Sequence, residues 1–137
     1  MSPTGQPPPA APNQAPLFIT AYGDGGFRIA GVRLEGPVLL TFERILDWPA
    51  DHRWSSDAPA FAVFTPDVLA SLFAATPTLE IVVIGCGARL IVPPAEMRTA
   101  AQAHRLALES MDTGAACRTY NALIADGRRA GAALWPV

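Results

Sequence analysis

The spacing of hydrophobic and polar positions changes character about half-way along the chain. In the first half, short apolar runs such as Phe18–Tyr22 and Phe27–Ile29 flank a glycine-rich turn at 23–26. A two-residue period bounded by turn residues is typical of half-buried strands. We therefore expect a small antiparallel meander between residues 17 and 48, with Val38–Leu40 as its last clear strand segment.

A first helix is expected after this meander. Thr65-Pro66-Asp67 combines a capping hydroxyl with a proline in the first turn, which is typical of a helix start. Apolar residues then recur at helical spacing. The expected buried stripe consists of Val68, Leu69, Leu72 and Phe73.

The second half predicts alternating strands and helices. Ile81–Ile84 is apolar on both faces, as in an interior strand of a parallel sheet. The remaining expected elements are a helix from Pro93-Pro94 to about Ala107, a strand at 108–111, a helix at 114–125 and a strand at 129–134. Such an order implies right-handed crossovers with helices packed on the sheet. The expected fold class is α/β, a compact domain with a mixed β-sheet, an N-terminal antiparallel meander and C-terminal strand–helix–strand crossovers.

Length and composition limit the domain organisation. The chain has 137 residues, half of them hydrophobic, which is enough for one domain with a packed core. Residues 1–16 contain six prolines and few apolar residues. We expect a disordered proline-rich arm over 1–16 and a single α/β domain over 17–137.

Charge and hydropathy exclude two classes of partner. The net charge is −2 and all ten basic residues are arginines spread among acids, so we expect no nucleic-acid binding. The most apolar run, Leu79–Val92, contains Gly85, Gly87 and Arg89 and is too short to span a bilayer. With only two cysteines, the chain fits a reducing compartment, and we expect a soluble cytoplasmic domain with no membrane insertion.

Gly85-Cys86-Gly87 follows the apolar strand at the position where dinucleotide-binding folds place a phosphate turn. The fingerprint requires a third glycine where this chain has Leu90, so the spacing fails and a tight strand exit is the better interpretation. We expect no cofactor. The two glycines still border a predicted cleft opposite the helix start at Asp112.

That helix start carries the strongest candidate site. Asp112 or Thr113 can cap the first amides, and Arg118 near a helix N-terminus could hold a small anion. The alternative is that Asp112 only caps and Arg118 pairs with a carboxylate. The candidate binding residues are Gly85, Gly87, Asp112, Thr113, Cys117, Arg118 and Asn121.

No catalytic residue is assigned, and Cys117 is the one alternative. A thiol in the first turns of a helix can have a lowered pKa, but it usually needs a base, and the two histidines, His52 and His104, lie on other segments. No spacing of histidines and carboxylates indicates a metal site. We further expect Cys86 and Cys117 at one sheet edge, within about 10 Å and unbonded, either as a redox switch or as two buried thiols.

Several motifs together resemble one known family. They are Tyr22-Gly23-x-Gly25-Gly26-Phe27-x-Ile29-x-Gly31, Val83-Ile84-Gly85-x-Gly87, Asp112-Thr113-x-x-Ala116-Cys117-x-Thr119-Tyr120-Asn121-x-Leu123 and Gly127-Arg128-x-x-x-Ala132-Ala133-Leu134-x-Pro136. On these motifs the chain resembles the domain of unknown function 498 family over residues 17–136. One branch of that family is the mitochondrial assembly factor of respiratory complex I (NADH:ubiquinone oxidoreductase).

The resemblance implies a non-enzymatic binding or assembly module with protein partners, among them subunits of a membrane respiratory complex. It also implies a cytoplasmic location, either free or peripheral to the inner membrane. Candidate contact segments are the turn at 23–27 and the loop at 48–57, which holds Trp48, His52, Arg53 and Trp54. A small-anion or ligand-binding protein, or an enzyme, that uses the cleft between Gly85–Gly87 and Asp112 is the alternative.

Overall fold

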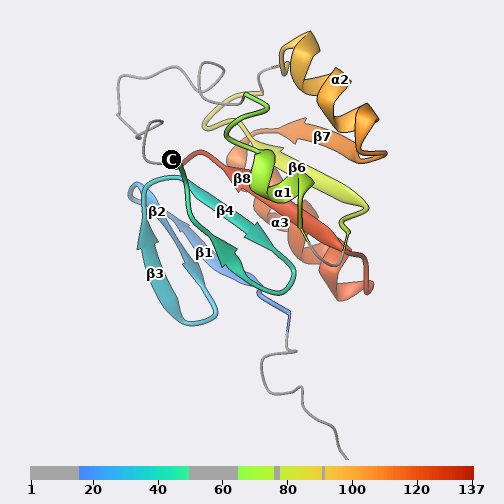
Figure 1. Ribbon diagram of the computed structural model, residues 1–137. Coiled ribbons are helices and arrows are strands. Elements are labelled where there is room, and N and C mark those ends of the chain that lie inside the picture. The colour runs from blue at the N-terminus through green and yellow to red at the C-terminus, as the bar shows by residue number, and fades with distance from the viewer. Residues whose placement is uncertain (1–15, 50–64, 76–77, 91) are drawn as a thin grey trace, which may run out of the picture.

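Two β-sheets form the frame of the molecule in the computed structural model, which describes residues 16–49, 65–75, 78–90 and 92–137 (Figure 1). The smaller sheet has the order β1-β2-β3 and is antiparallel throughout. Its strands are β1 (Ile19–Gly23), β2 (Gly26–Ile29) and β3 (Val32–Glu35). The predicted N-terminal meander is confirmed in these three strands.

The larger sheet has five strands in the order β5-β4-β8-β6-β7. They are β4 (Val38–Thr41), β5 (Ile45–Leu46), β6 (Ile81–Gly85), β7 (Ala107–Met111) and β8 (Ala130–Leu134). Strand β6 is parallel to β7 and β8, whereas β4 is antiparallel to β8 and β5. The mixed sheet is thus confirmed, but β4 leaves the meander and joins this second sheet, because its four residues are all buried and need cover on both faces.

The helices cover opposite faces of the larger sheet. These are α1 (Ala70–Phe73), α2 (Ala95–Ala103) and α3 (Thr113–Ala125). The β6–α2–β7 crossover moves one way along the sheet, and β7–α3–β8 moves back past β6. Two crossovers of the same hand but opposite direction must place their helices on opposite faces. Figure 1 shows α1 in front of β6 and β8 with α3 behind them.

Alternating residues of the sheet point into two separate hydrophobic cores, one on each face. On β6, Val82 and Ile84 face a core that contains Leu72 of α1 and Met97 of α2. Val83 faces the second core, which the small sheet and α3 complete. Its large side chains include Phe27, Ile29, Leu40, Tyr120, Ile124 and Leu134. The two-faced apolar pattern of 81–84 is therefore explained by burial on both sides.

Two predicted helices are shorter than expected. The first begins with a hydrogen bond from the Val68 N–H to the Thr65 hydroxyl, as predicted, but only one α-helical turn, α1, follows it. The second, α2, ends at Ala103 rather than near Ala107. Arg105 adopts a positive φ of 55°, which stops the helix and lets the chain enter β7.

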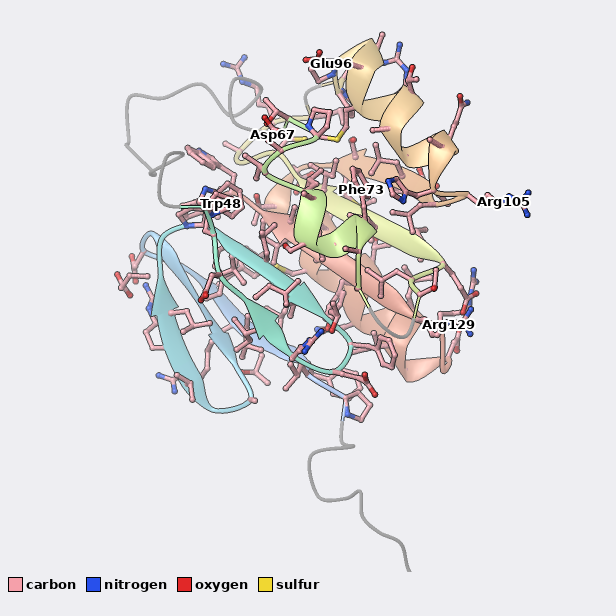
Figure 2. All side chains as sticks on the ribbon, viewed as in Figure 1. Trp48, Asp67, Phe73, Glu96, Arg105 and Arg129 are labelled. Carbon is pink, nitrogen blue, oxygen red and sulfur yellow. The ribbon has the colours of Figure 1, made fainter. Side chains whose placement is uncertain are left out.

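The ends of α1 and α2 are joined by an aromatic contact. Phe73 and His104 stack with ring centroids 5.1 Å apart, and Figure 2 shows Phe73 beside the sheet with Arg105 projecting away beyond α2.

Within the ranges that the structure describes, no helix is long and apolar enough to cross a bilayer. The predicted arm, apart from Pro16, lies outside the described residues, as do His52, Arg53 and Trp54.

Candidate functional site

The turn that follows β6 is fastened to the first residue of α3. The Thr113 hydroxyl accepts a hydrogen bond from the Gly87 N–H at 2.8 Å and donates one to the Trp135 carbonyl at 2.6 Å. The Thr113 N–H in turn donates to the Gly87 carbonyl at 2.8 Å. Thr113 is fully buried, so its hydroxyl joins three chain segments and is not available to a ligand.

Direct packing surrounds Gly85 on the same turn. A Cβ at Gly85 would lie 3.1 Å from the Thr113 Cα, 3.1 Å from the Ala116 Cβ and 2.9 Å from Leu134. The sequence predicted a cleft between Gly85–Gly87 and the helix start; at Gly85 the two sides are in contact, and a binding role for this region stays a prediction. The residues do meet, as expected for the carboxyl end of a parallel strand, but they meet in contact.

Asp112 caps α3, as the sequence predicts. Its carboxylate accepts a hydrogen bond from the Ala115 N–H at 2.9 Å, and its backbone is extended, as an N-cap residue requires. The helix terminus is thus closed by its own side chain. A second anion at this point would have to compete with a carboxylate already in place.

A hollow of about 350 Å³ lies instead between β1 and α3. It is lined by Ile19, Thr20, Ala21, Tyr22, Cys117, Arg118 and Asn121. Three of the seven predicted binding residues therefore gather here, on α3. The other four line the packed turn described above.

Asn121 serves the fold within this hollow. Its Oδ1 accepts a hydrogen bond from the Ile19 N–H at 2.9 Å, and its Nδ2 donates to the Ile19 carbonyl at 2.8 Å. Both ends of the amide are therefore used to hold β1. Asn121 also lines the hollow, and these two bonds leave one Nδ2 proton and one Oδ1 lone pair unused.

Arg118 lies at the exposed side of the hollow. Its Nη1 donates to the Tyr22 hydroxyl at 3.5 Å, a long and weak contact. It forms no ion pair with a carboxylate in the described part of the chain. The sequence had left open that Arg118 pairs with a carboxylate. Among the described residues it contacts Tyr22 of β1 instead.

Cys117 is buried at 2 % exposure, and loss of solvation raises the pKa of its thiol to about 12, although the Arg118 charge partly opposes the rise. At neutral pH the thiol is protonated and a poor nucleophile. His104 stacks on Phe73 in a contact on the other side of the sheet. The catalytic alternative for Cys117 is therefore not favoured.

The two cysteines belong to different cores. Cys86 packs with Met97 and Trp135 on one face of the larger sheet, and Cys117 packs with Tyr120 on the other. They are not joined by a disulfide, and both are buried. Burial agrees with the interpretation as two buried thiols, while their predicted separation of about 10 Å stays a prediction.

Tyr22 and Thr20 were not expected in the site. The contact between Tyr22 and Arg118 joins positions 96 residues apart, and it depends on how the small sheet packs on α3. Gly114 makes room for it, since a Cβ there would lie 2.7 Å from the Tyr22 hydroxyl. The only local hint of this contact in the sequence was Tyr22 itself, an aromatic residue directly before a glycine turn.

Across the described ranges, no three His, Cys, Asp or Glu side chains group as a metal site requires.

Comparison with known proteins places the chain in a family. The model of a protein family of unknown function, DUF498/DUF598, matches residues 19–135. The chain belongs to this family. The resemblance inferred from the sequence motifs is thus confirmed.

Two curated relatives illustrate the range of the family. The human NADH dehydrogenase [ubiquinone] 1 alpha subcomplex assembly factor 3 is 32% identical over 120 residues, which cover 88% of this chain and 61% of that protein. An uncharacterized protein of Rhodobacter capsulatus is 33% identical over 121 residues, which cover 88% of this chain and 86% of that protein. The chain thus spans about three fifths of the length of the assembly factor.

Solved structures show the same fold. A Bartonella henselae protein, described as an outer membrane protein, matches with a TM-score of 0.76 and 29% identity over 90% of this chain and 98% of that one. A Bordetella pertussis protein described as an Mth938-like domain matches with a TM-score of 0.70 and 26% identity over 99% and 92%. The predicted fold class is therefore confirmed.

Proposed function

We propose that this chain is a non-enzymatic assembly module that binds subunits of respiratory complex I. The observation that carries the proposal is the similarity to complex I assembly factor 3, which runs through 88% of this chain at 32% identity in the human protein. The family model matches residues 19–135, which include both sheets and α3. This range is the part on which any common binding surface would have to lie.

The chemistry of the described residues supports a binding role. The thiol of Cys117 is buried and protonated, and the Thr113 hydroxyl is hydrogen-bonded on both sides. The carboxylate of Asp112 caps a helix. Among these described side chains, none is poised as a nucleophile or a base. The enzyme alternative has no support from this geometry.

The contact surface that we propose includes the turn between β1 and β2. Asp24 is exposed there with a positive φ of 52°, and the Gly25 N–H donates to the carbonyl of Val137 at 2.9 Å. The turn is therefore held against the C-terminal residue. Trp48 is the first residue of the second predicted contact segment, and its ring centroid lies 6.2 Å from that of Trp135. We propose that the chain works in the cytoplasm, at the periphery of the inner membrane.

Affinity purification tests this function. The tagged full chain would be expressed in the organism that carries its gene, and membranes would be solubilised with a mild detergent before capture. We expect complex I subunits to be enriched over a tagged bait of unrelated fold, and deletion of the gene to reduce the amount of assembled complex on native gels. Normal complex I in the deletion strain, together with no subunit in the capture, would overturn the proposal.

A further inference from the structure

We propose that the hollow between β1 and α3 is a binding site for the carboxylate of an acidic side chain on a protein partner. Arg118 and Tyr22 would hold the carboxylate. The inference rests on the proposed function only for the partner being a protein.

The hollow has the right size for a side chain. About 350 Å³ is at the lower end of the range of ligand pockets, which begins at about 300 Å³. The hydrogen bonds from Asn121 to both backbone groups of Ile19 close its floor. An added β-strand cannot pair with β1 at Ile19, because the backbone groups there are occupied. A single side chain can enter without displacing any of these contacts.

The Arg118 and Tyr22 side chains at the hollow are hydrogen-bond donors that have no negatively charged acceptor among the described residues. Arg118 is exposed and carries five N–H donors, of which one makes the 3.5 Å contact with Tyr22. The Tyr22 hydroxyl accepts that bond and donates its proton to no other described residue. A carboxylate accepts from a guanidinium and a phenol at once, and charge-assisted bonds of this kind are about twice as strong as neutral ones.

The remaining lining favours an acid over a base. No Asp or Glu lines the hollow, and the pKa of Cys117 is raised to about 12 by burial, so the thiol is uncharged. The Asp112 carboxylate lies outside the lining but near Tyr22, where its Oδ1 already accepts from the Ala115 N–H. Ile19 and Ala21 offer apolar contact to the methylene groups that carry the bound carboxylate. Arg33 and Arg128, by contrast, are already paired with Glu35 and Glu80.

Peptide titration followed by NMR tests the site on the full chain labelled with ¹⁵N. The probe is acetyl-Gly-Glu-Gly-amide, whose only charge is the side-chain carboxylate, and its neutral match is acetyl-Gly-Gln-Gly-amide. We expect the Glu peptide to shift the amide signals of Thr20–Tyr22 and Ala115–Asn121. The Gln peptide should bind about tenfold more weakly or not at all.

Two variants assign the effect to Arg118. Arg118→Gln should remove the Glu-peptide shifts, and Arg89→Gln, which changes an exposed arginine on the segment after β6, should leave them unchanged. Unaltered spectra elsewhere would show that both variants fold. Equal shifts with the Gln peptide, shifts spread over all exposed arginines, or an unchanged titration in Arg118→Gln would each overturn the proposal.

A third probe and the affinity capture separate this inference from the proposed function. Acetyl-Gly-Gly-Gly with a free carboxylate carries the same charge at its end, and binding of this peptide alone would overturn the assignment to a side chain. Equal partner recovery by wild type and Arg118→Gln would overturn the docking role but leave the assembly function standing. An empty capture by wild type would count against the assembly function, while the peptide titration would still report on the site.

Discussion

Asn121 of α3 holds Ile19 of β1 by both of its backbone groups. The Ile19 N–H donates to the Asn121 Oδ1 at 2.9 Å, and the Ile19 carbonyl accepts from Nδ2 at 2.8 Å. A side-chain amide thereby takes the place of a neighbouring strand at the outer edge of the small sheet. Because a side-chain amide presents N–H donors and a carbonyl acceptor side by side, it can satisfy both backbone groups of one residue, as few side chains can.

Replacing this amide should loosen the small sheet. Asn121→Ala leaves a half-buried N–H and a carbonyl of Ile19 without partners, and we expect a loss of about 1–3 kcal/mol in the free energy of unfolding. Urea denaturation followed by circular dichroism measures it. Ala122→Gln, at an exposed position of the same helix, is the matched control and should change stability by less than about 0.5 kcal/mol. Equal stabilities for the two variants would contradict the role of Asn121.

Thr113→Val should be among the more costly conservative changes in the chain. The substitution keeps the shape of the side chain but removes a buried hydroxyl that serves the Gly87 N–H and the Trp135 carbonyl. We expect a loss of about 2–3 kcal/mol, because a buried polar group left unpaired costs its desolvation energy. Thr119→Val, on the same helix and with no side-chain hydrogen bond to a described residue, should be nearly neutral in the same urea experiment. A neutral Thr113→Val would mean that water replaces the hydroxyl.

Two glycines near the start of α3 should respond oppositely to alanine. At Gly85 the new Cβ meets the Thr113 backbone and the Ala116 Cβ at 3.1 Å, and neither can move freely, so Gly85→Ala should be destabilising. At Gly114 the new Cβ meets only the end of the exposed Tyr22 side chain and its own cap. Gly114→Ala should gain up to about 1 kcal/mol of helix propensity. Thermal unfolding should therefore rank Gly114→Ala above wild type and Gly85→Ala below it.

The Gly114 variant also links stability to the hollow. The added methyl group displaces the Tyr22 hydroxyl from its place near Arg118, so the Glu-peptide shifts should weaken even as the protein becomes more stable. A variant that binds the peptide as wild type does would show that Tyr22 is dispensable for the carboxylate. Such a result would leave Arg118 as the sole group holding it.

Local signals in the sequence predicted most of the fold but only part of the site. The helix start at 112–113 follows from capping chemistry, and the cap is confirmed at Asp112. The end of α2 did not follow, because Arg105 takes a positive φ that its residue type does not favour. The pairing of Tyr22 with Arg118 did not follow either, since it is set by sheet-on-helix packing and by no local pattern.

Cys117 should make the protein sensitive to alkaline pH. Burial raises the pKa of its thiol from an ordinary value of 9.0 to about 12 in the folded state, so between these values the folded protein keeps a proton that the unfolded chain releases. The stability that depends on this proton is complete below about pH 9 and is lost as the pH rises toward 12. Burial raises the pKa of Tyr120 in the same direction.

We therefore expect the free energy of unfolding in urea to fall between about pH 9 and pH 11, and to fall less steeply in Cys117→Ala, in which Tyr120 still contributes. The slope is the quantity to compare, since the lost sulfur lowers stability at every pH. Iodoacetamide provides a second test. At pH 8 it should leave Cys117 of the folded protein unmodified while it alkylates the same residue in urea, as mass spectrometry of the peptides would show. Rapid alkylation of the folded protein at that position would mean that the thiol is neither buried nor protonated as the structure has it.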